Sequence, residues 1–307
     1  MSVRTLSILG STGSIGTSAL SVIAHANATE AEPVFTIDTL AAGRNADLLI
    51  EQAKAFQPQH VVIADETSFA HVRDALAHTG ISVAAGKAAV TEAARRPVDR
   101  LLAAIVGIDG LPSTLAAIEA GNSIALANKE SMVCAGPLLN RLAEANQVAI
   151  VPTDSEHNAM FQVMERREDI ERLILTASGG PFRGASDAQL KSVTPEMALA
   201  HPQWEMGQKI SIDSATLFNK GLELIEASYL FNMPEDQIEV VVHPQSVIHS
   251  AVAYRDGSVL AQMGTPDMQT PIAHALTWPD RRQSNSVKRL DLIALSRLDF
   301  EARDAEN

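Results

Sequence analysis

Two acidic residues separated by a single residue are the first feature of the sequence that could do chemistry. Asp154 and Glu156 follow the apolar run Val148–Pro152, which we expect to be a buried strand. In an extended segment, residues two apart point the same way, so both carboxylates could bind one cation. Hard divalent ions such as Mg²⁺ and Mn²⁺ take oxygen ligands of this kind. Surface acids also produce this pattern, but Glu223, in a polar cluster further along, offers a third carboxylate.

A second group of residues could bind a phosphate. The segment 178–180 is a serine followed by two glycines, a sequence that can present backbone N–H groups to an anion. The side chains of Ser214, Asn219 and Lys220 are further donors of the kind that phosphate sites use. Taken singly, each of these residues is equally typical of a turn or a helix cap.

The segment 194–207 combines His201, Trp204 and Met206 with two prolines. The chain has only two tryptophans, and one placed in a loop is an unusual use of this residue. We expect a lid that closes over a substrate and excludes water. The alternative is a surface loop that Trp204 packs against the second domain.

Three glycines follow the first apolar run at the amino terminus. Gly10, Gly13 and Gly16 lie where a strand is expected to turn into a helix. Glycines there permit a tight turn close to a pyrophosphate, and the helix start offers unpaired N–H groups. The G-x-x-G-x-x-G spacing departs from the usual G-x-G-x-x-G, and an ordinary glycine-rich turn is the alternative.

The end of the second expected strand indicates which nucleotide binds. An acid there usually selects NADH, but Asp38 is followed by four more residues before the turn, so we place it inside the strand. The turn itself is Gly43-Arg44-Asn45. An arginine at this position can pair with a 2′-phosphate, which favours NADPH, whereas a solvated loop cation is the alternative.

The elements that must position these residues alternate along the first half of the chain. Amphipathic helical patterns such as Ala46–Phe56, Glu66–His78 and Glu130–Asn146 separate short apolar runs. This rhythm predicts an α/β fold with a Rossmann-type, doubly wound parallel sheet. The expected strands are Thr5–Leu9, Val34–Ala41, His60–Ala64, Ile81–Ala85, Leu101–Val106, Ser123–Ala127 and Val148–Pro152.

The second half of the chain has a different pattern of expected elements. Three further strands are expected at Ile238–His243, Val247–Tyr254 and Val259–Met263, the last two joined by a hairpin turn. We therefore predict an NADPH-binding domain at residues 1–150, a central α+β catalytic domain at 151–280 and a linker-like tail at 281–307.

Composition limits the classes of function. A chain of 307 residues with 46% hydrophobic content can bury a sizeable core, and its formal charge of −13 opposes binding to nucleic acid. No apolar run reaches the roughly 20 residues of a membrane span, and no leader-like segment precedes the first strand. The single cysteine, Cys134, which we expect to be buried, excludes an internal disulfide, so we expect a cytoplasmic protein.

Six strings, read in order, resemble the 1-deoxy-D-xylulose 5-phosphate reductoisomerase family. They are G-S-T-G-S-I-G (10–16), A-N-K-E-S (127–131), P-T-D-S-E-H (152–157), S-G-G-P-F (178–182), H-P-x-W-x-M-G (201–207) and D-S-A-T-x-x-N-K-G-L-E (213–223). The last three together are highly specific, and the resemblance extends from residue 3 to about residue 300.

The resemblance implies an enzyme that rearranges 1-deoxy-D-xylulose 5-phosphate and reduces the product with NADPH to 2-C-methyl-D-erythritol 4-phosphate, in the non-mevalonate route to isoprenoids. It implies a homodimer and a metal site, for Mg²⁺ or Mn²⁺, formed by Asp154, Glu156 and Glu223. Lys129 and Glu156 would be the catalytic side chains, with a metal-bound water as the alternative to Glu156 in proton transfer. The substrate contacts would be Ser155, Glu156, Ser178, His201, Trp204, Met206, Ser214, Asn219, Lys220 and Glu223. The cofactor contacts would be Gly10, Thr12, Gly13, Ser14, Ile15, Gly16, Gly43, Arg44, Asn45, Asn128, Glu130 and Gly207.

Two departures from the family pattern leave alternatives open. The family commonly has lysine in place of Arg44, which conserves the positive charge. Family members also continue into a C-terminal helical domain, which we expect this sequence to lack because it stops at Asn307. A truncated, non-catalytic NADPH-binding form is therefore one alternative. Another NADP-dependent dehydrogenase is the other, although it would leave the three carboxylates unexplained and Cys134 lacks the partner that a semialdehyde dehydrogenase needs.

Overall fold

The computed structural model describes residues 3–200, 207–281 and 287–302. The chain forms two compact units, and neither is a single stretch of sequence. The first unit comprises Met1–Asp154 and Met268–Ser286, and the second comprises Ser155–Asp267 and Val287–Asn307.

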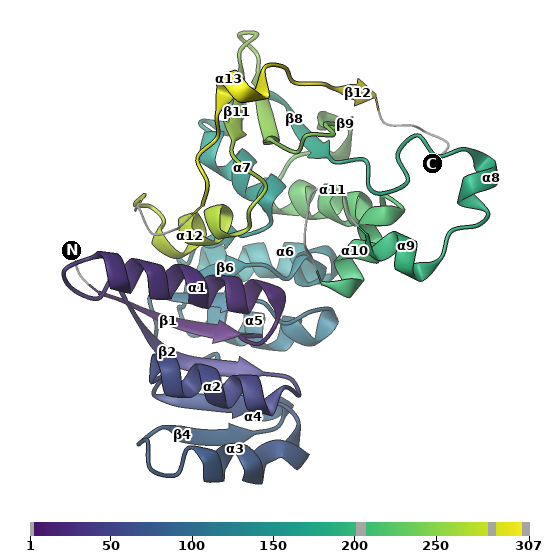
Figure 1. The fold of residues 1–307 in the computed structure, drawn as a ribbon. Coiled ribbons are helices and arrows are strands. Elements are labelled where there is room, and N and C mark those ends of the chain that lie inside the picture. Colours follow the sequence, from purple (N-terminus) through teal and green to yellow (C-terminus); the bar gives the residue numbers. More distant parts are fainter. Residues whose placement is uncertain (1–2, 201–206, 282–286, 303–307) are drawn as a thin grey trace. The chain divides into compact units, whose positions relative to one another are not determined.

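A parallel sheet of seven strands forms the centre of the first unit (Figure 1). Its strands are β1 (Arg4–Leu9), β2 (Phe35–Ala42), β3 (His60–Ile63), β4 (Ser82–Ala85), β5 (Arg100–Ala103), β6 (Ile124–Leu126) and β7 (Ile150–Pro152). The strand order is β4-β3-β2-β1-β5-β6-β7, and every neighbouring pair is parallel. The order changes direction between β1 and β5, and in open sheets of this kind ligands bind at the carboxyl ends of the strands where that change occurs.

Helices connect these strands, and their apolar residues recur at helical spacing. In α1, the buried Ala19, Leu20, Ile23 and Ala26 form one face of the helix. The helices of this unit are α1 (Ser14–Thr29), α2 (Ala46–Phe56), α3 (Phe69–Ala75), α4 (Lys87–Ala93), α5 (Leu111–Glu119), α6 (Lys129–Ala145) and α12 (Gln269–Thr277), with 3₁₀ turns η1 (Glu66–Ser68) and η2 (Ile108–Gly110).

Helix α12 comes from the far end of the sequence and completes the first unit. It packs against α1, β6 and β7 (Figure 1). The Arg4 side chain donates hydrogen bonds to the carbonyls of Leu276, at 3.1 Å, and Trp278, at 2.8 Å, and forms an ion pair with Asp280. These hydrogen bonds and the ion pair connect the start of β1 to the end of α12.

The second unit contains a mixed sheet of five strands in the order β11-β10-β8-β9-β12. Strands β8 and β9 are parallel and the other neighbours are antiparallel. The strands are β8 (Ile170–Ala177), β9 (Ile238–Val242), β10 (Ile248–Tyr254), β11 (Val259–Met263) and β12 (Glu301–Ala302). The helices are α7 (Ser155–Val163), α8 (Asp187–Leu190), α9 (Pro195–Leu199), α10 (Gln208–Ala215), α11 (Phe218–Leu230) and α13 (Leu292–Leu295), with 3₁₀ turns η3 (Arg167–Asp169) and η4 (Glu235–Gln237).

The core of this unit lies where α7 and α11 pack on the sheet. Met160 from α7 and Phe231, just after α11, join Leu173, Leu175 and Val252 from the strands. This apolar cluster fixes the two helices that carry Glu156 and Glu223, because both helices bury a face in it.

The predicted fold class is confirmed: a Rossmann-type parallel sheet and a second α+β unit. The ten expected strands form, with bounds shifted by up to three residues, and Arg255–Ser258 links β10 to β11 as predicted. The extents of the units differ from the predicted ranges, because α12 lies within 151–280 but packs in the first unit. Within 281–307, β12 pairs with β9 of the second sheet. Among the described residues, no helix is long and apolar enough to cross a membrane.

Candidate functional site

The glycines after β1 have the geometry that the sequence predicts for a nucleotide turn. Gly10 has φ +94°, and a Cβ there would lie 2.4 Å from the Ala104 carbonyl oxygen. A Cβ on Gly16 would lie 2.3 Å from the Gly10 carbonyl oxygen, so helix α1 starts in direct contact with the turn. These two positions therefore require glycine.

The start of α1 is open to a ligand. Gly13 is its N-cap residue and makes no side-chain capping bond, and Gly13 and Ser14 are exposed while Thr12 and Ile15 are partly so. The first N–H groups of the helix thus have no side-chain cap, and they lie at the point where the strand order reverses. This combination suits the pyrophosphate of a dinucleotide.

The turn after β2 is consistent with the choice of NADPH. Gly43, Arg44 and Asn45 are exposed, and the Asn45 side chain caps α2 by accepting a hydrogen bond from the Leu48 amide. Asp38 lies inside β2, as predicted.

Asp38 forms an ion pair with Arg96. Its carboxylate accepts two hydrogen bonds from Arg96, at 2.7 and 2.9 Å. Burial alone would raise the pKa of Asp38, but the bonds from Arg96 and Thr39 hold it below its usual value. This aspartate is therefore ionised and bound to arginine, which leaves Arg44 as the charged side chain of the turn after β2.

The segment 128–130 contributes a structural asparagine and a buried lysine. Asn128 caps α6 by accepting a hydrogen bond from the Ser131 amide and donates to the carbonyl of Gly107. Its amide also donates to Glu130, at 3.2 Å. Lys129 is 6% exposed, and its ammonium lies 2.6 Å from an oxygen of Asp154 within the same unit. An ammonium has three donors, so Lys129 could also donate to a substrate oxygen.

Glu156 reaches its position differently from our expectation. Residues 154–156 are not extended, because β7 ends at Pro152 and α7 begins at Ser155. The argument that alternate residues share one side was therefore wrong. Glu156 lies instead in the first turn of α7, where a carboxylate is favoured by the helix dipole.

Helix α11 brings the remaining acid to Glu156. Lys220 lies between the two acids, 2.8 Å from Glu156 and hydrogen-bonded to Glu223, while Asn219 donates to the other oxygen of Glu223 at 2.5 Å. Asn219 and Lys220 can both reach Glu223 because they precede it by four and three positions on the helix. Glu223 is 1% exposed. Burial alone would lower the pKa of Lys220, but the two carboxylates raise it above its usual value.

The chemistry of these acids fits a divalent cation. Glu156 and Glu223, both in the second unit, each offer a carboxylate oxygen, and these two oxygens lie within 4.8 Å of one another. A carboxylate as buried as Glu223 needs a compensating positive charge, and oxygen ligands match Mg²⁺ and Mn²⁺. Glu156 and Glu223, two of the three residues predicted as metal ligands, could therefore hold such an ion within the second unit.

Two of the expected phosphate donors, Ser178 and Ser214, lie in segments that pack against each other. In the segment 178–180, the Gly180 amide donates to the Ser178 hydroxyl at 3.2 Å. Gly179 and Gly180 have φ values of +86° and +69°. A Cβ on Gly180 would lie 2.7 Å from the Ser214 carbonyl oxygen, so this turn packs directly against the end of α10. Ser178 and Ser214 thus come from adjoining segments of the second unit.

Two further predicted residues, Ser155 and Gly207, lie at the starts of helices α7 and α10. Ser155 donates to Glu156 at 2.5 Å, and Gly207 is the exposed N-cap of α10. His201, Trp204 and Met206 lie outside the described residues. Cys134 is exposed on α6, so the expectation that it is buried was wrong.

Sequence reasoning missed a buried pair behind the carboxylates. His157 and Glu226 are 0% and 1% exposed, with 3.4 Å between Nδ1 and a carboxylate oxygen. His157 Nε2 donates to the Glu223 carbonyl at 2.9 Å, since a carbonyl can only accept. The available signals were the histidine directly after Glu156 and the second acid one helical turn beyond Glu223. The pair ties α7 to α11 beneath the site.

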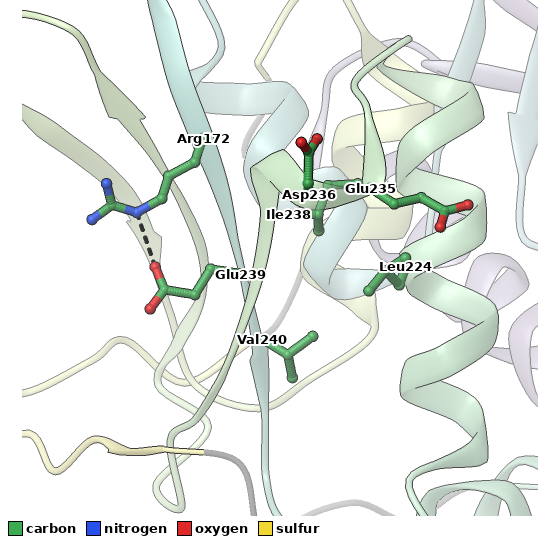
Figure 2. A pocket seen from close by; sticks show the side chains of 7 residues that line it. All are labelled: Arg172, Leu224, Glu235, Asp236, Ile238, Glu239 and Val240. Atoms are coloured by element: carbon green, nitrogen blue, oxygen red, sulfur yellow. Dashed lines mark hydrogen bonds and ion pairs between the residues drawn. The ribbon is translucent and has the colours of Figure 1, made fainter. Parts of the chain in front are cut away.

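A pocket of about 650 Å³ in the second unit has a different character (Figure 2). Of the predicted site residues that the structure describes, none lines it. Its charged side chains are the exposed acids Glu235 and Asp236 and the ion pair Arg172–Glu239, at 2.9 Å. Because acids outnumber the single, paired arginine, this pocket is unsuited to a phosphorylated substrate.

Three family models match successive parts of the chain. Residues 6–136 match the family model described as 1-deoxy-D-xylulose 5-phosphate reductoisomerase. Residues 150–231 match that of the reductoisomerase C-terminal domain, and 263–307 match a further model described as DXP reductoisomerase C-terminal domain. The tail that we expected to be linker-like therefore falls within a family domain model.

Relatives and solved structures agree with these matches. The reductoisomerases of Rhodospirillum centenum and Caulobacter vibrioides are each 54% identical to the chain, over 98% and 99% of it and 74% and 75% of their own length. The structure of the Zymomonas mobilis reductoisomerase in complex with NADPH has 47% identity and a TM-score of 0.91, covering 100% of this chain and 78% of its own. A reductoisomerase in complex with NADPH, fosmidomycin and magnesium has 44% identity and a TM-score of 0.93, covering 99% and 76%. The chain belongs to the 1-deoxy-D-xylulose 5-phosphate reductoisomerase family.

Proposed function

We propose that the chain converts 1-deoxy-D-xylulose 5-phosphate to 2-C-methyl-D-erythritol 4-phosphate, with NADPH as reductant and Mg²⁺ or Mn²⁺ as the metal. The observation that carries the proposal is the carboxylate pair Glu156 and Glu223, bridged by Lys220, in a chain of this family. A dehydrogenase that used no metal would have no need for this group of acids.

The side chains of the second unit would bind and orient the substrate. Ser178, Ser214, Asn219 and Lys220 would hold its phosphate, which anchors one end and leaves the other to react. His201, Trp204 and Met206 would add further substrate contacts. Binding energy at the phosphate would then act on the reacting carbons, because it fixes their position.

The reacting end would meet carboxylates and a buried ammonium. When bound by Asp154, Glu156 and Glu223, the divalent cation supplies Lewis-acid stabilisation of negative charge developing on substrate oxygens. Lys129, held by Asp154, would donate a hydrogen bond to a substrate oxygen. Glu156 would hold or move a proton at its Oε1 or Oε2.

The first unit would bind the reductant. NADPH supplies hydride to the rearranged carbonyl compound. The N–H groups at residues 12–15 would hold its pyrophosphate, and Arg44 would pair with the 2′-phosphate. Its remaining contacts would come from Gly43, Asn45, Asn128, Glu130 and Gly207. We also propose a cytoplasmic homodimer, supported by the family resemblance.

The test is NADPH absorbance in the presence of 1-deoxy-D-xylulose 5-phosphate, with Mg²⁺ or Mn²⁺ and then with a chelator. We expect NADPH oxidation that requires both substrate and metal. Oxidation that survives the chelator would favour a metal-free dehydrogenase. NADPH binding without any oxidation would indicate a non-catalytic form.

A further inference from the structure

Lys220 and Asn219 stand out because their present partners differ from the ligand assigned to them. Family resemblance assigns both to the phosphate of the substrate. In the structure both side chains bind carboxylates that are proposed metal ligands. The ammonium of Lys220 contacts Glu156 and Glu223, and the amide of Asn219 contacts the second oxygen of Glu223.

These contacts occupy the oxygens that a cation needs. Lys220 bonds Oε1 of Glu156 and Oε2 of Glu223, and Asn219 bonds Oε1 of Glu223. Both Glu223 oxygens therefore already have a donor. Glu223 is buried, so its charge must be balanced by some positive group, and Lys220 supplies that charge here.

The same contacts limit what Lys220 can offer a phosphate. An ammonium has three donors, and two of them point to carboxylates. A divalent cation on these carboxylates would replace the charge that Lys220 supplies and would repel the ammonium, since like charges at contact distance are unfavourable. A phosphate dianion would attract the displaced ammonium.

We propose that Lys220 and Asn219 are shared between the metal site and the phosphate site, so that each ligand strengthens the binding of the other. With neither ligand bound, the two side chains bind Glu156 and Glu223. With both bound, the cation takes the carboxylates, and the lysine and asparagine donate to the phosphate. The proposal rests on the proposed function above, and it adds an energetic coupling between its two sites.

Coupling of this kind is reciprocal. If phosphate raises the affinity for Mg²⁺ by some factor, then Mg²⁺ must raise the affinity for phosphate by the same factor. Couplings between sites usually lie between about 5-fold and 150-fold, and for one shared ammonium and one amide we expect about tenfold.

The experiment is calorimetric titration of the whole chain with MgCl₂, without sodium phosphate and with phosphate at saturation. Phosphate is then titrated with and without Mg²⁺. The expected result is about tenfold tighter Mg²⁺ binding with phosphate present, and the same factor in the reverse titration. These measurements need no variant, so they do not depend on whether a substituted chain folds.

Two variants identify the group that carries the coupling. In Lys220→Met we expect Mg²⁺ to bind without phosphate at least as tightly as in the wild type, because the ammonium that competes for the carboxylates is gone. The ratio of Mg²⁺ affinities with and without phosphate should fall from about ten towards one. Lys191→Met removes an exposed lysine of the same unit and should keep the full effect. Full coupling in Lys220→Met would overturn the role of this lysine.

The outcomes also separate this proposal from the function on which it rests. Equal Mg²⁺ affinity with and without phosphate in the wild type would overturn the coupling and leave the metal site in place. No Mg²⁺ binding under any condition would overturn the proposed metal site itself, and the coupling with it.

Discussion

At the scale of single residues, the site is a set of charges that must balance one another. Glu223 is almost fully buried, and Lys220 and Asn219 use both of its oxygens. Removing one negative charge from this set changes what the site can hold, whereas the glycine turn of the first unit is not altered. The metal-binding and NADPH-binding properties should therefore respond differently to substitution.

We expect Glu223→Gln to weaken Mg²⁺ binding by at least about 100-fold, because losses of 10- to 100-fold already follow from changes behind a ligand. Metal-dependent turnover should fall accordingly, while the dissociation constant of NADPH stays nearly unchanged. Calorimetry with Mg²⁺ and fluorescence titration with NADPH measure the two quantities. Unchanged turnover would remove Glu223 from the metal site.

His249 gives the second unit a dependence of stability on pH. Burial lowers the pKa of this histidine to about 4, and the nearby His243 contributes in the same direction. The unfolded chain therefore takes up a proton near pH 6.5, before the folded chain does. Stability is full above pH 6.5 and is lost as the pH falls towards about 4.

The loss between these pH values should reach about 3 kcal/mol, because one pKa unit corresponds to about 1.4 kcal/mol. Chemical denaturation at a series of pH values measures it. In His249→Gln the free energy of unfolding should change less over this window, while the exposed His78→Gln serves as the control. An identical slope in wild type and His249→Gln would contradict the assignment.

At the scale of elements, the parts that the sequence predicts well are those governed by local pattern. Each parallel strand is a short apolar run, and its helix has apolar residues at helical spacing, so both could be found without knowing their neighbours. Strand β12 has only two residues and exists because it pairs with Val241 and Val242. No local pattern could reveal it.

The same reasoning explains the outcome at the site. The three carboxylates predicted as metal ligands could be singled out in the sequence because their residue type defines the chemistry. The contact of Lys220 with Glu156 joins residues 64 apart, and the contact between His157 and Glu226 depends on how α7 packs on α11. Neither contact follows from a local pattern. The start of α7 was misjudged because an apolar strand followed by polar residues does not show where a helix begins.

The turn between β1 and α1 carries a prediction at this scale. Gly16→Ala places a Cβ 2.3 Å from the Gly10 carbonyl oxygen, so either the turn or the helix must move. We expect a loss of about 1–3 kcal/mol in the free energy of unfolding, together with weaker NADPH binding.

Gly43→Ala is the matched control for stability, because a Cβ there meets nothing within 4 Å. Denaturation of both variants in urea makes the comparison. Equal stability of Gly16→Ala and the wild type would show that the turn tolerates a side chain and is not fixed by this contact.

At the scale of the whole molecule, the first unit depends on a segment from late in the sequence. Arg4 bonds the carbonyls of Leu276 and Trp278 and pairs with Asp280, and Arg100 also donates to Trp278. Burial lowers the pKa of Arg100 to about 10. Two arginines thus hold the end of α12 against the amino-terminal edge of β1 and β5.

We expect Arg4→Met to reduce the free energy of unfolding of the first unit by about 1–3 kcal/mol, because it removes the Arg4 donor to the carbonyl of the buried Leu276. Mg²⁺ affinity in the second unit should not change. Arg73→Met, which breaks an exposed pair with Asp74, is the control and should have almost no effect. A loss in Arg4→Met no larger than in this control would mean that the contacts with α12 contribute little.

The return of α12 also bears on how the protein is made. Helix α1 leaves the ribosome before α12, and Leu276, which receives the Arg4 bond, follows Arg4 by 272 residues. At about 5–20 residues per second, this interval is roughly 14–54 s. During that time the part of α1 that α12 later covers is available to chaperones. The first unit cannot complete its packing until almost all of the second unit has been synthesised.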